Sequence, residues 1–157
     1  MPYYDSTHQS YVDRLRRFLG DHEGTNILNQ NEESTDDFLH DCIEDALDEI
    51  NFFYRPTSYT FDSIISKSVP WNLVKLGATL QMLTGKGILS ARNVLSYNDV
   101  GGIQVSDYDV YGRYINYYNV LINKYQEFLR AFKLSSNIND CYGGFGSEMD
   151  QEAPWQW

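Results

Sequence analysis

The residues best suited to chemistry are the carboxylates of segment 21–49. This segment holds 11 Asp and Glu and no Lys or Arg, and five of its acids share one side of a predicted helix: Asp41, Glu44, Asp45, Asp48 and Glu49. Clustered carboxylates can bind a divalent cation or act as an acid–base pair. A calcium-binding EF-hand, however, needs alternating oxygen ligands, a central glycine and a closing glutamate, and a di-iron bundle needs Glu-x-x-His on two helices. Neither pattern is present, since Asp37-x-x-His40 occurs once. We therefore expect a charged surface and no metal site.

The histidines and glycines form no catalytic pattern either. His8, His22 and His40 are scattered over polar segments, and each is predicted to be a surface side chain. Gly85-Lys86-Gly87 lacks the spacing and the Ser or Thr of a phosphate-binding loop, and Gly143-Gly144-Phe145-Gly146 follows no predicted strand. Without a nucleophile, a base or a cofactor motif, the chain is predicted not to be an enzyme and is assigned no cofactor.

Charge and composition narrow the class of protein further. The chain has 157 residues, a formal net charge of −10 and 15% aromatic residues. This length suits one domain, the aromatic content is too high for a disordered chain, and the charge argues against binding nucleic acid by attraction. The absence of a long apolar run or an apolar N-terminal core predicts a soluble chain that stays where it is made, with no membrane contact. Cys42 and Cys141 lie far apart, which favours two free thiols over a disulfide.

The acidic residues are carried by a helix predicted over residues 35–53. Ser34 and Thr35 can cap its start, and Pro56 limits its end. Its other side is an apolar stripe at a spacing of three to four, formed by Phe38, Leu39, Cys42, Ile43, Ala46, Leu47, Ile50 and Phe53. This pattern predicts an amphipathic helix with its acids turned away from the core.

The elements around this helix are also mostly helical. A short helix is predicted over 10–19, ended by Gly20, with Val12, Leu15 and Leu19 on one side and Arg14, Arg16 and Arg17 largely outside it. A short helical turn is predicted near 62–66, within the loop 54–69. A third helix is predicted after a cap at Ser68, with Pro70 near its first turn, and can continue to Val94. It is apolar on two sides, so it belongs in the middle of a bundle or at a subunit contact, and Gly77-Ala78 allows a neighbouring helix to approach closely.

The C-terminal third combines a hairpin, a long helix and an irregular tail. Asp99-Val100-Gly101-Gly102 predicts the turn of a hairpin over 95–106. A helix follows from about Asp107 to Lys133, with an apolar seam in heptad spacing at Tyr111, Ile115, Tyr118, Ile122, Tyr125, Leu129 and Phe132. Its flank adds apolar surface that suits either the core or a second subunit. Residues 135–157 show no helical period, and their aromatic side chains are candidate partner-binding residues: Tyr142, Phe145, Trp155 and Trp157.

Together these segments predict a mainly α fold, a small helical bundle with a short β-hairpin and extended N- and C-terminal segments. We divide it into an N-terminal helix with an acidic loop (1–34), the helical bundle core with its hairpin (35–134) and a flexible aromatic and acidic docking tail (135–157).

Residues 35–134 resemble the head-to-tail adaptor proteins (connector or neck proteins) of tailed bacteriophages. The likeness lies in Asp45-Ala46-Leu47-x-x-Ile50-Asn51, in Trp71-Asn72-Leu73-Val74 with Gly77-Ala78, in Ala91-Arg92-Asn93 before Tyr97-Asn98-Asp99-x-Gly101-Gly102, and in the tyrosine-rich last helix.

The resemblance implies a structural virion protein that assembles in the host cytoplasm and lies in the neck between head and tail. Identical subunits would form a ring, a dodecamer, beneath the portal protein and would bind the next neck or tail-completion protein. DNA would pass through the ring without specific binding. The five acids from Asp41 to Glu49 then line the channel, meet a neighbouring subunit or face solvent. The alternative is a small acidic helical binding module, a phage-encoded inhibitor or DNA mimic that acts through its aromatic tail.

Overall fold

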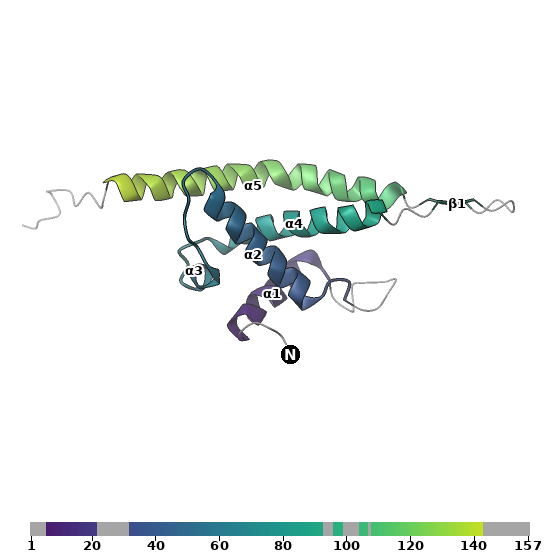
Figure 1. The fold of residues 1–157 in the computed structure, drawn as a ribbon, viewed down its shortest axis with the longest axis horizontal. Coiled ribbons are helices and arrows are strands. Elements are labelled where there is room, and N and C mark those ends of the chain that lie inside the picture. Colours follow the sequence, from purple (N-terminus) through teal and green to yellow (C-terminus); the bar gives the residue numbers. More distant parts are fainter. Residues whose placement is uncertain (1–5, 22–31, 93–95, 99–103, 107, 143–157) are drawn as a thin grey trace, which may run out of the picture.

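The computed structural model describes residues 6–21, 32–92, 96–98, 104–106 and 108–142 (Figure 1). The fold is mainly helical, as predicted. Its helices are α1 (Ser6–Leu19), α2 (Asp36–Phe52), α3 (Phe61–Ile65), α4 (Trp71–Arg92) and α5 (Tyr108–Tyr142). None of the helices in these ranges is long and apolar enough to cross a membrane.

Helix α2 forms within one residue of its predicted bounds. The hydroxyl of Thr35 accepts a hydrogen bond from the backbone N–H of Phe38 at 3.3 Å, so the N-cap is made as its sequence indicates. Asp36 and Asp37 occupy the first turn, where a negative charge is favourable. The chain leaves the helix after Phe52, and Tyr54 takes a positive φ of 57° two residues before Pro56.

Helix α4 lies in the middle of the bundle, which confirms the position predicted from its two apolar sides. It packs along α2 and α5, and every residue from Leu76 to Leu80 is buried. A Cβ added at Gly77 would lie 2.9 Å from the Cβ of Ala46 on α2 and 3.1 Å from Cε2 of Tyr125 on α5. The glycine therefore marks a point where three helices approach one another closely, as the Gly77-Ala78 pair indicated.

Helix α5 is longer than predicted. It continues past Lys133 to Tyr142, so the prediction of an irregular chain from residue 135 is wrong for its first eight residues. Extending an existing helix by one residue is far easier than starting one, and no glycine or proline stands between Lys133 and Gly143. The predicted seam faces the core at Tyr125 and Leu129, which are fully buried, whereas Ile115 near its start is exposed.

The two smallest helices complete the bundle. Helix α1 begins at Ser6, four residues before its predicted start, and packs on α2 through the buried side chains of Val12 and Leu15. Helix α3 is the short helix predicted in the loop between α2 and α4, and Phe61 and Ile64 bury its inner side.

In the sequence between α4 and α5 stand two three-residue strands, β1 (Ser96–Asn98) and β2 (Gln104–Ser106), which pair antiparallel with each other. The predicted turn falls in residues 99–103, outside the described residues, so the hairpin as a whole stays a prediction. Residues 1–5 and 143–157 also lie outside the described residues.

Candidate functional site

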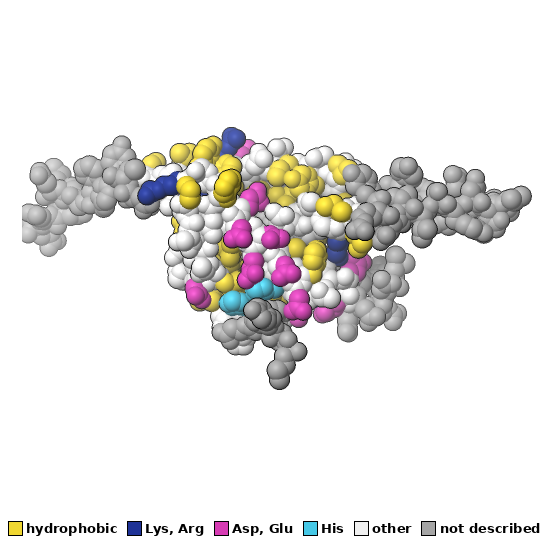
Figure 2. Space-filling model, viewed as in Figure 1, with side chains coloured by type: hydrophobic (Ala, Val, Ile, Leu, Met, Phe, Trp, Pro, Cys, Tyr) yellow, Lys and Arg dark blue, Asp and Glu magenta, His cyan; other side chains and the backbone are white. Residues whose placement is uncertain are grey.

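The five predicted acids form one exposed surface on α2, here called the acidic face: Asp41, Glu44, Asp45, Asp48 and Glu49. All five side chains are exposed, whereas the residues between them are buried against the bundle. Figure 2 shows acidic side chains gathered over α2 on the front of the molecule. The spacing alone placed these acids correctly.

Few contacts within the chain neutralise the acidic face. Gln81 donates a hydrogen bond from Nε2 to Oε2 of Glu49 at 3.2 Å. In the part of the chain that the structure describes, no hydrogen bond or ion pair joins Asp41, Asp45 or Asp48 to another side chain, and α2 itself contains no Lys or Arg. Such a surface repels phosphate and attracts a basic protein surface.

His40 is buried, so its prediction as a surface histidine is wrong. Only 7% of the residue is exposed, because α1 and α3 cover it. Nε2 of His40 lies 3.1 Å from Nδ1 of His8 in a hydrogen bond, and both rings stack on Phe61. The helical period hid this, since His40 stands at the edge of the apolar stripe and its aromatic neighbours come from distant segments. His22 lies outside the described residues.

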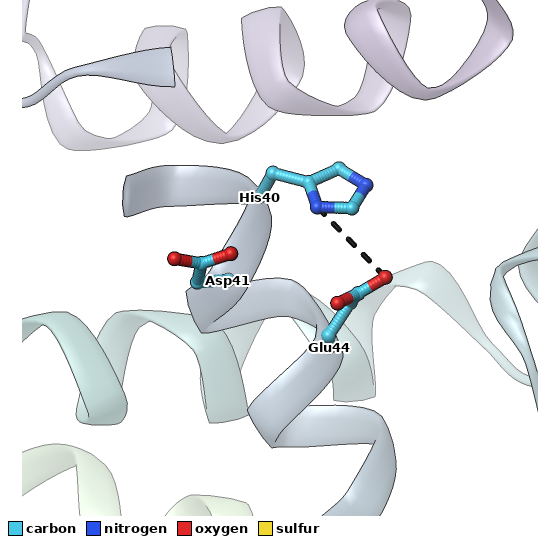
Figure 3. A group of neighbouring side chains, drawn as sticks. All are labelled: His40, Asp41 and Glu44. Atoms are coloured by element: carbon cyan, nitrogen blue, oxygen red, sulfur yellow. Dashed lines mark ion pairs between the residues drawn. The ribbon is translucent and has the colours of Figure 1, made fainter. Parts of the chain in front are cut away.

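His40, Asp41 and Glu44 also form the one group of metal-type ligands among the described residues (Figure 3). Their ligand atoms lie within 4.8 Å of one another, and Nδ1 of His40 is 3.9 Å from Oε1 of Glu44. The two carboxylates are exposed, and exposed acids are common without an ion, so the group by itself does not define a metal site.

A second charged cluster, around Arg16, holds α1 against the start of α2. Arg16 is 4% exposed, and its guanidinium donates to Asp21 at 3.3 Å, to Asp36 at 2.6 Å and to the carbonyl of Ser34 at 2.8 Å. Partial burial alone would raise the pKa of Asp36, but the hydrogen bonds from Arg16 and Gln9 and the charge of Arg16 outweigh it and lower that pKa. The cluster is structural. The sequence pattern missed it because Arg16 was expected outside the packed face of its helix.

The thiol of Cys42 lies in the core beneath the acidic face. Burial raises its pKa to about 12, and the charges of Asp45 and Asp41 add to the effect. Cys42 is free, as predicted, and its high pKa makes it a poor nucleophile.

Helix α5 exposes a line of large apolar side chains, here called the outer face of α5: Tyr117, Val120, Phe128, Leu134 and Ile138. Between 44% and 72% of each of these residues is exposed. Successive members lie three, eight, six and four positions apart, and these spacings place them on one side of the helix. Lys124 lies on the same side, in the gap between Val120 and Phe128. The core seam of α5 lies on the other side of the helix, so the outer face points away from the bundle. The sequence pattern offered the flank of Tyr114, Tyr117, Leu121 and Phe128 for the core or for a second subunit. The structure packs Tyr114 and Leu121 against the core and leaves Tyr117 and Phe128 exposed.

The predicted aromatic docking site falls almost entirely outside the described residues. Tyr142 is the last residue of α5, and nothing describes its side chain. Phe145, Trp155 and Trp157 lie outside the described residues, so their role in binding a partner stays a prediction.

Comparison with known proteins gave no match to a protein-family model, to a curated protein or to a solved structure.

Proposed function

We propose that this chain is a structural virion protein, a head-to-tail connector adaptor whose copies form a ring beneath the portal. The ring would join the DNA-filled capsid to the next neck or tail component and leave a channel for DNA. Support comes from the sequence resemblance over residues 35–134 and from a bundle organised around a central helix and one long helix. The predicted hairpin near 95–106 and the aromatic tail would be its reaching contacts with neighbours.

The observation that carries the proposal is the uncovered outer face of α5. A helix of 35 residues is about 50 Å long, whereas its bundle partner α4 has only 22 residues. A long line of exposed apolar side chains is unusual on a protein that works alone and is typical of an assembly surface. A protein whose task is assembly needs such surfaces and needs no catalytic site.

The acidic face supports one further candidate, a DNA mimic that blocks a basic protein. Five exposed carboxylates on one side of α2 resemble a row of phosphates in charge. This candidate leaves the outer face of α5 without a use, so we rank it second.

Electron microscopy of the purified chain, together with labelled antibody on phage particles that contain it, tests the proposal. The connector function predicts rings with a central channel and label at the junction of head and tail. A chain that is absent from particles and binds a basic host protein as a monomer would overturn the proposal in favour of the mimic.

A further inference from the structure

The outer face of α5 and the acidic face of α2 have the properties of two halves of one interface. We infer that the outer face of α5 binds the acidic face of α2 on a second copy of this chain, so that copies join head to tail. The inference rests on the proposed function for its purpose, but its geometry depends only on the described residues.

The outer face of α5 carries positive charge among its apolar side chains. Lys124 lies within the line, and Arg113 precedes Tyr117 by one turn on the same side. The ammonium of Lys124 lies 5.8 Å from the centre of the Phe128 ring, which keeps the charge on this face. Among the described side chains of α5, Glu127 is the one acid, and no carboxylate of the described residues forms an ion pair with Lys124.

The acidic face of α2 is complementary in charge. Asp41, Asp45 and Asp48 are followed on the same side of the helix by Phe52, which is 87% exposed. The acids of the acidic face extend over eight positions, from Asp41 to Glu49, about 12 Å, and the cations of the outer face of α5 over 11 positions, from Arg113 to Lys124, about 16 Å. The acidic face therefore offers negative charge beside Phe52, and the outer face of α5 offers two cations beside exposed aromatic groups, with Glu127 as the one opposing acid among the described side chains on the same side.

The two faces cannot meet within one chain. Both α2 and α5 pack on α4 (Figure 1). Asp41, Asp45 and Asp48 lie on the exposed side of α2, and the outer face of α5 lies opposite its buried seam. Pairing them requires a second molecule. Because the two surfaces differ, the contact is heterologous, and repeated contacts of this kind close into a ring or continue as a filament.

The two kinds of contact have different tasks. Burial of Val120, Phe128 and Phe52 supplies the attraction, since removing apolar surface from water drives most association. The opposite charges set the register and exclude the wrong pairing of two acidic or two basic faces. Charge pairs at the edge of an interface weaken in salt, so association is expected to be weaker at 1 M than at 0.1 M ionic strength, where screening reaches about 3 Å and about 10 Å.

A charge exchange tests the pairing directly. One variant carries Asp41→Lys, Asp45→Lys and Asp48→Lys on α2, which makes that face net positive, and the other carries Arg113→Glu and Lys124→Glu on α5, which makes that face net negative. Each variant alone presents like charges on both faces, so sedimentation velocity is expected to show self-association at least about tenfold weaker than wild type. In an equal mixture, every face again finds an opposite charge, and association is expected to return.

Matched controls separate this pairing from a general effect of charge. Asp62 and Lys67 are exposed and lie outside both faces, so Asp62→Lys and Lys67→Glu are expected to associate like wild type. Replacing one apolar residue of the outer face, Val120→Glu, is expected to weaken association. Leu89 is also exposed but lies on α4, outside both faces, so Leu89→Glu is expected to associate like wild type. Circular dichroism confirms that each variant is folded, and Val120→Glu carries the test if a charge variant fails to fold.

The outcomes separate this inference from the proposed function. Three results would each overturn the inference. The wild-type chain could stay monomeric at low salt, a charge-reversal variant could associate as strongly as wild type, or an equal mixture of the two variants could fail to associate. If the reversal variants still build rings in particles, the connector function stands and the interface is elsewhere. If the mixture recovers but the protein is absent from particles, the interface stands and the connector function fails.

Discussion

Gly77→Ala tests the packing of the three central helices at the point where they approach closely around Gly77. The new methyl would lie 2.9 Å from the Cβ of Ala46, 3.1 Å from Cε2 of Tyr125 and 3.2 Å from its hydroxyl oxygen. Carbon atoms prefer a separation of about 3.5–4.0 Å. The Cβ of Ala46 is fixed to the backbone of α2, so relief requires α2 to move away from α4.

The expected cost follows from two opposing terms. Overpacking a well-filled core costs about 1–3 kcal/mol, whereas replacing Gly by Ala inside a helix gains up to about 1 kcal/mol. Gly77→Ala is therefore expected to lower the free energy of unfolding by about 1 kcal/mol. Gly87 on the same helix is the matched control, because a Cβ there meets nothing within 4 Å. Gly87→Ala keeps only the helix gain of about 0.5–1 kcal/mol, so the two variants differ by about 2 kcal/mol.

Thermal and urea unfolding followed by circular dichroism measure this difference. For a chain of this size, about 2 kcal/mol corresponds to about 4–8 °C in the melting temperature. Adding Ala46→Gly to Gly77→Ala removes the methyl group that the new Cβ meets first, so the double variant is expected to be more stable than the sum of the two single effects predicts. If Gly77→Ala stabilises the chain as much as Gly87→Ala, the close approach of the three helices is refuted.

Three further predictions concern the charged cluster and the core. Arg16→Met is expected to lower the free energy of unfolding by about 3 kcal/mol, because it removes the cation that pairs with the buried carboxylate of Asp21. Arg17 is exposed, so Arg17→Met is expected to change stability little. Equal effects of the two variants on urea unfolding would contradict the structural role of the Arg16 cluster. Because folding lowers the pKa of Asp36, this carboxylate stabilises the fold at neutral pH and loses that effect as the pH falls below its ordinary value of 3.8. The stability difference between wild type and Asp36→Asn is therefore expected to shrink in acid, and a difference that is constant with pH would be the contrary result. In a Cys141→Ser variant, Cys42 is the only thiol, and it is expected to react slowly with iodoacetamide at pH 8 because burial raises its pKa to about 12. Denaturant is expected to make the reaction fast. Rapid labelling of the folded chain would show instead that the thiol is accessible.

The parts of the fold that the sequence predicted are those fixed by local pattern. Helix α2 has a cap, acids in its first turn and an unbroken apolar stripe, and each of these signals indicates the same helix. The central place of α4 follows from its two apolar sides and from Gly77. The five acids of the candidate site share a face for the same reason, since a period of 3.6 residues decides which residues of one helix point together.

The parts that the sequence did not predict depend on partners from elsewhere in the chain. Arg16 was expected outside the packed side of its helix because of its helical position, and His40 was expected at the surface because it stands in a polar segment. Arg16 is buried because carboxylates from the segment that follows α1 surround it, and His40 because His8 and Phe61 cover it. Burial of a polar group becomes favourable when partners satisfy it, and these partners come from α1, α3 and the start of α2. A helical period carries no information about them.

The charge on the two faces bears on whether the acidic face repels DNA or binds a neighbour. The acidic face offers five carboxylates, whereas the described part of α5 offers Arg113, Lys124 and Arg130, with Glu127 opposing them. The pairing that we propose therefore leaves an excess of negative charge along each contact between subunits. A ring closed by such contacts would hold its subunits together by local charge pairs and apolar burial, and it would still repel phosphate over the Debye length. Helix α2 could consequently bind a neighbouring subunit and still leave enough negative charge to repel the DNA that passes through the ring.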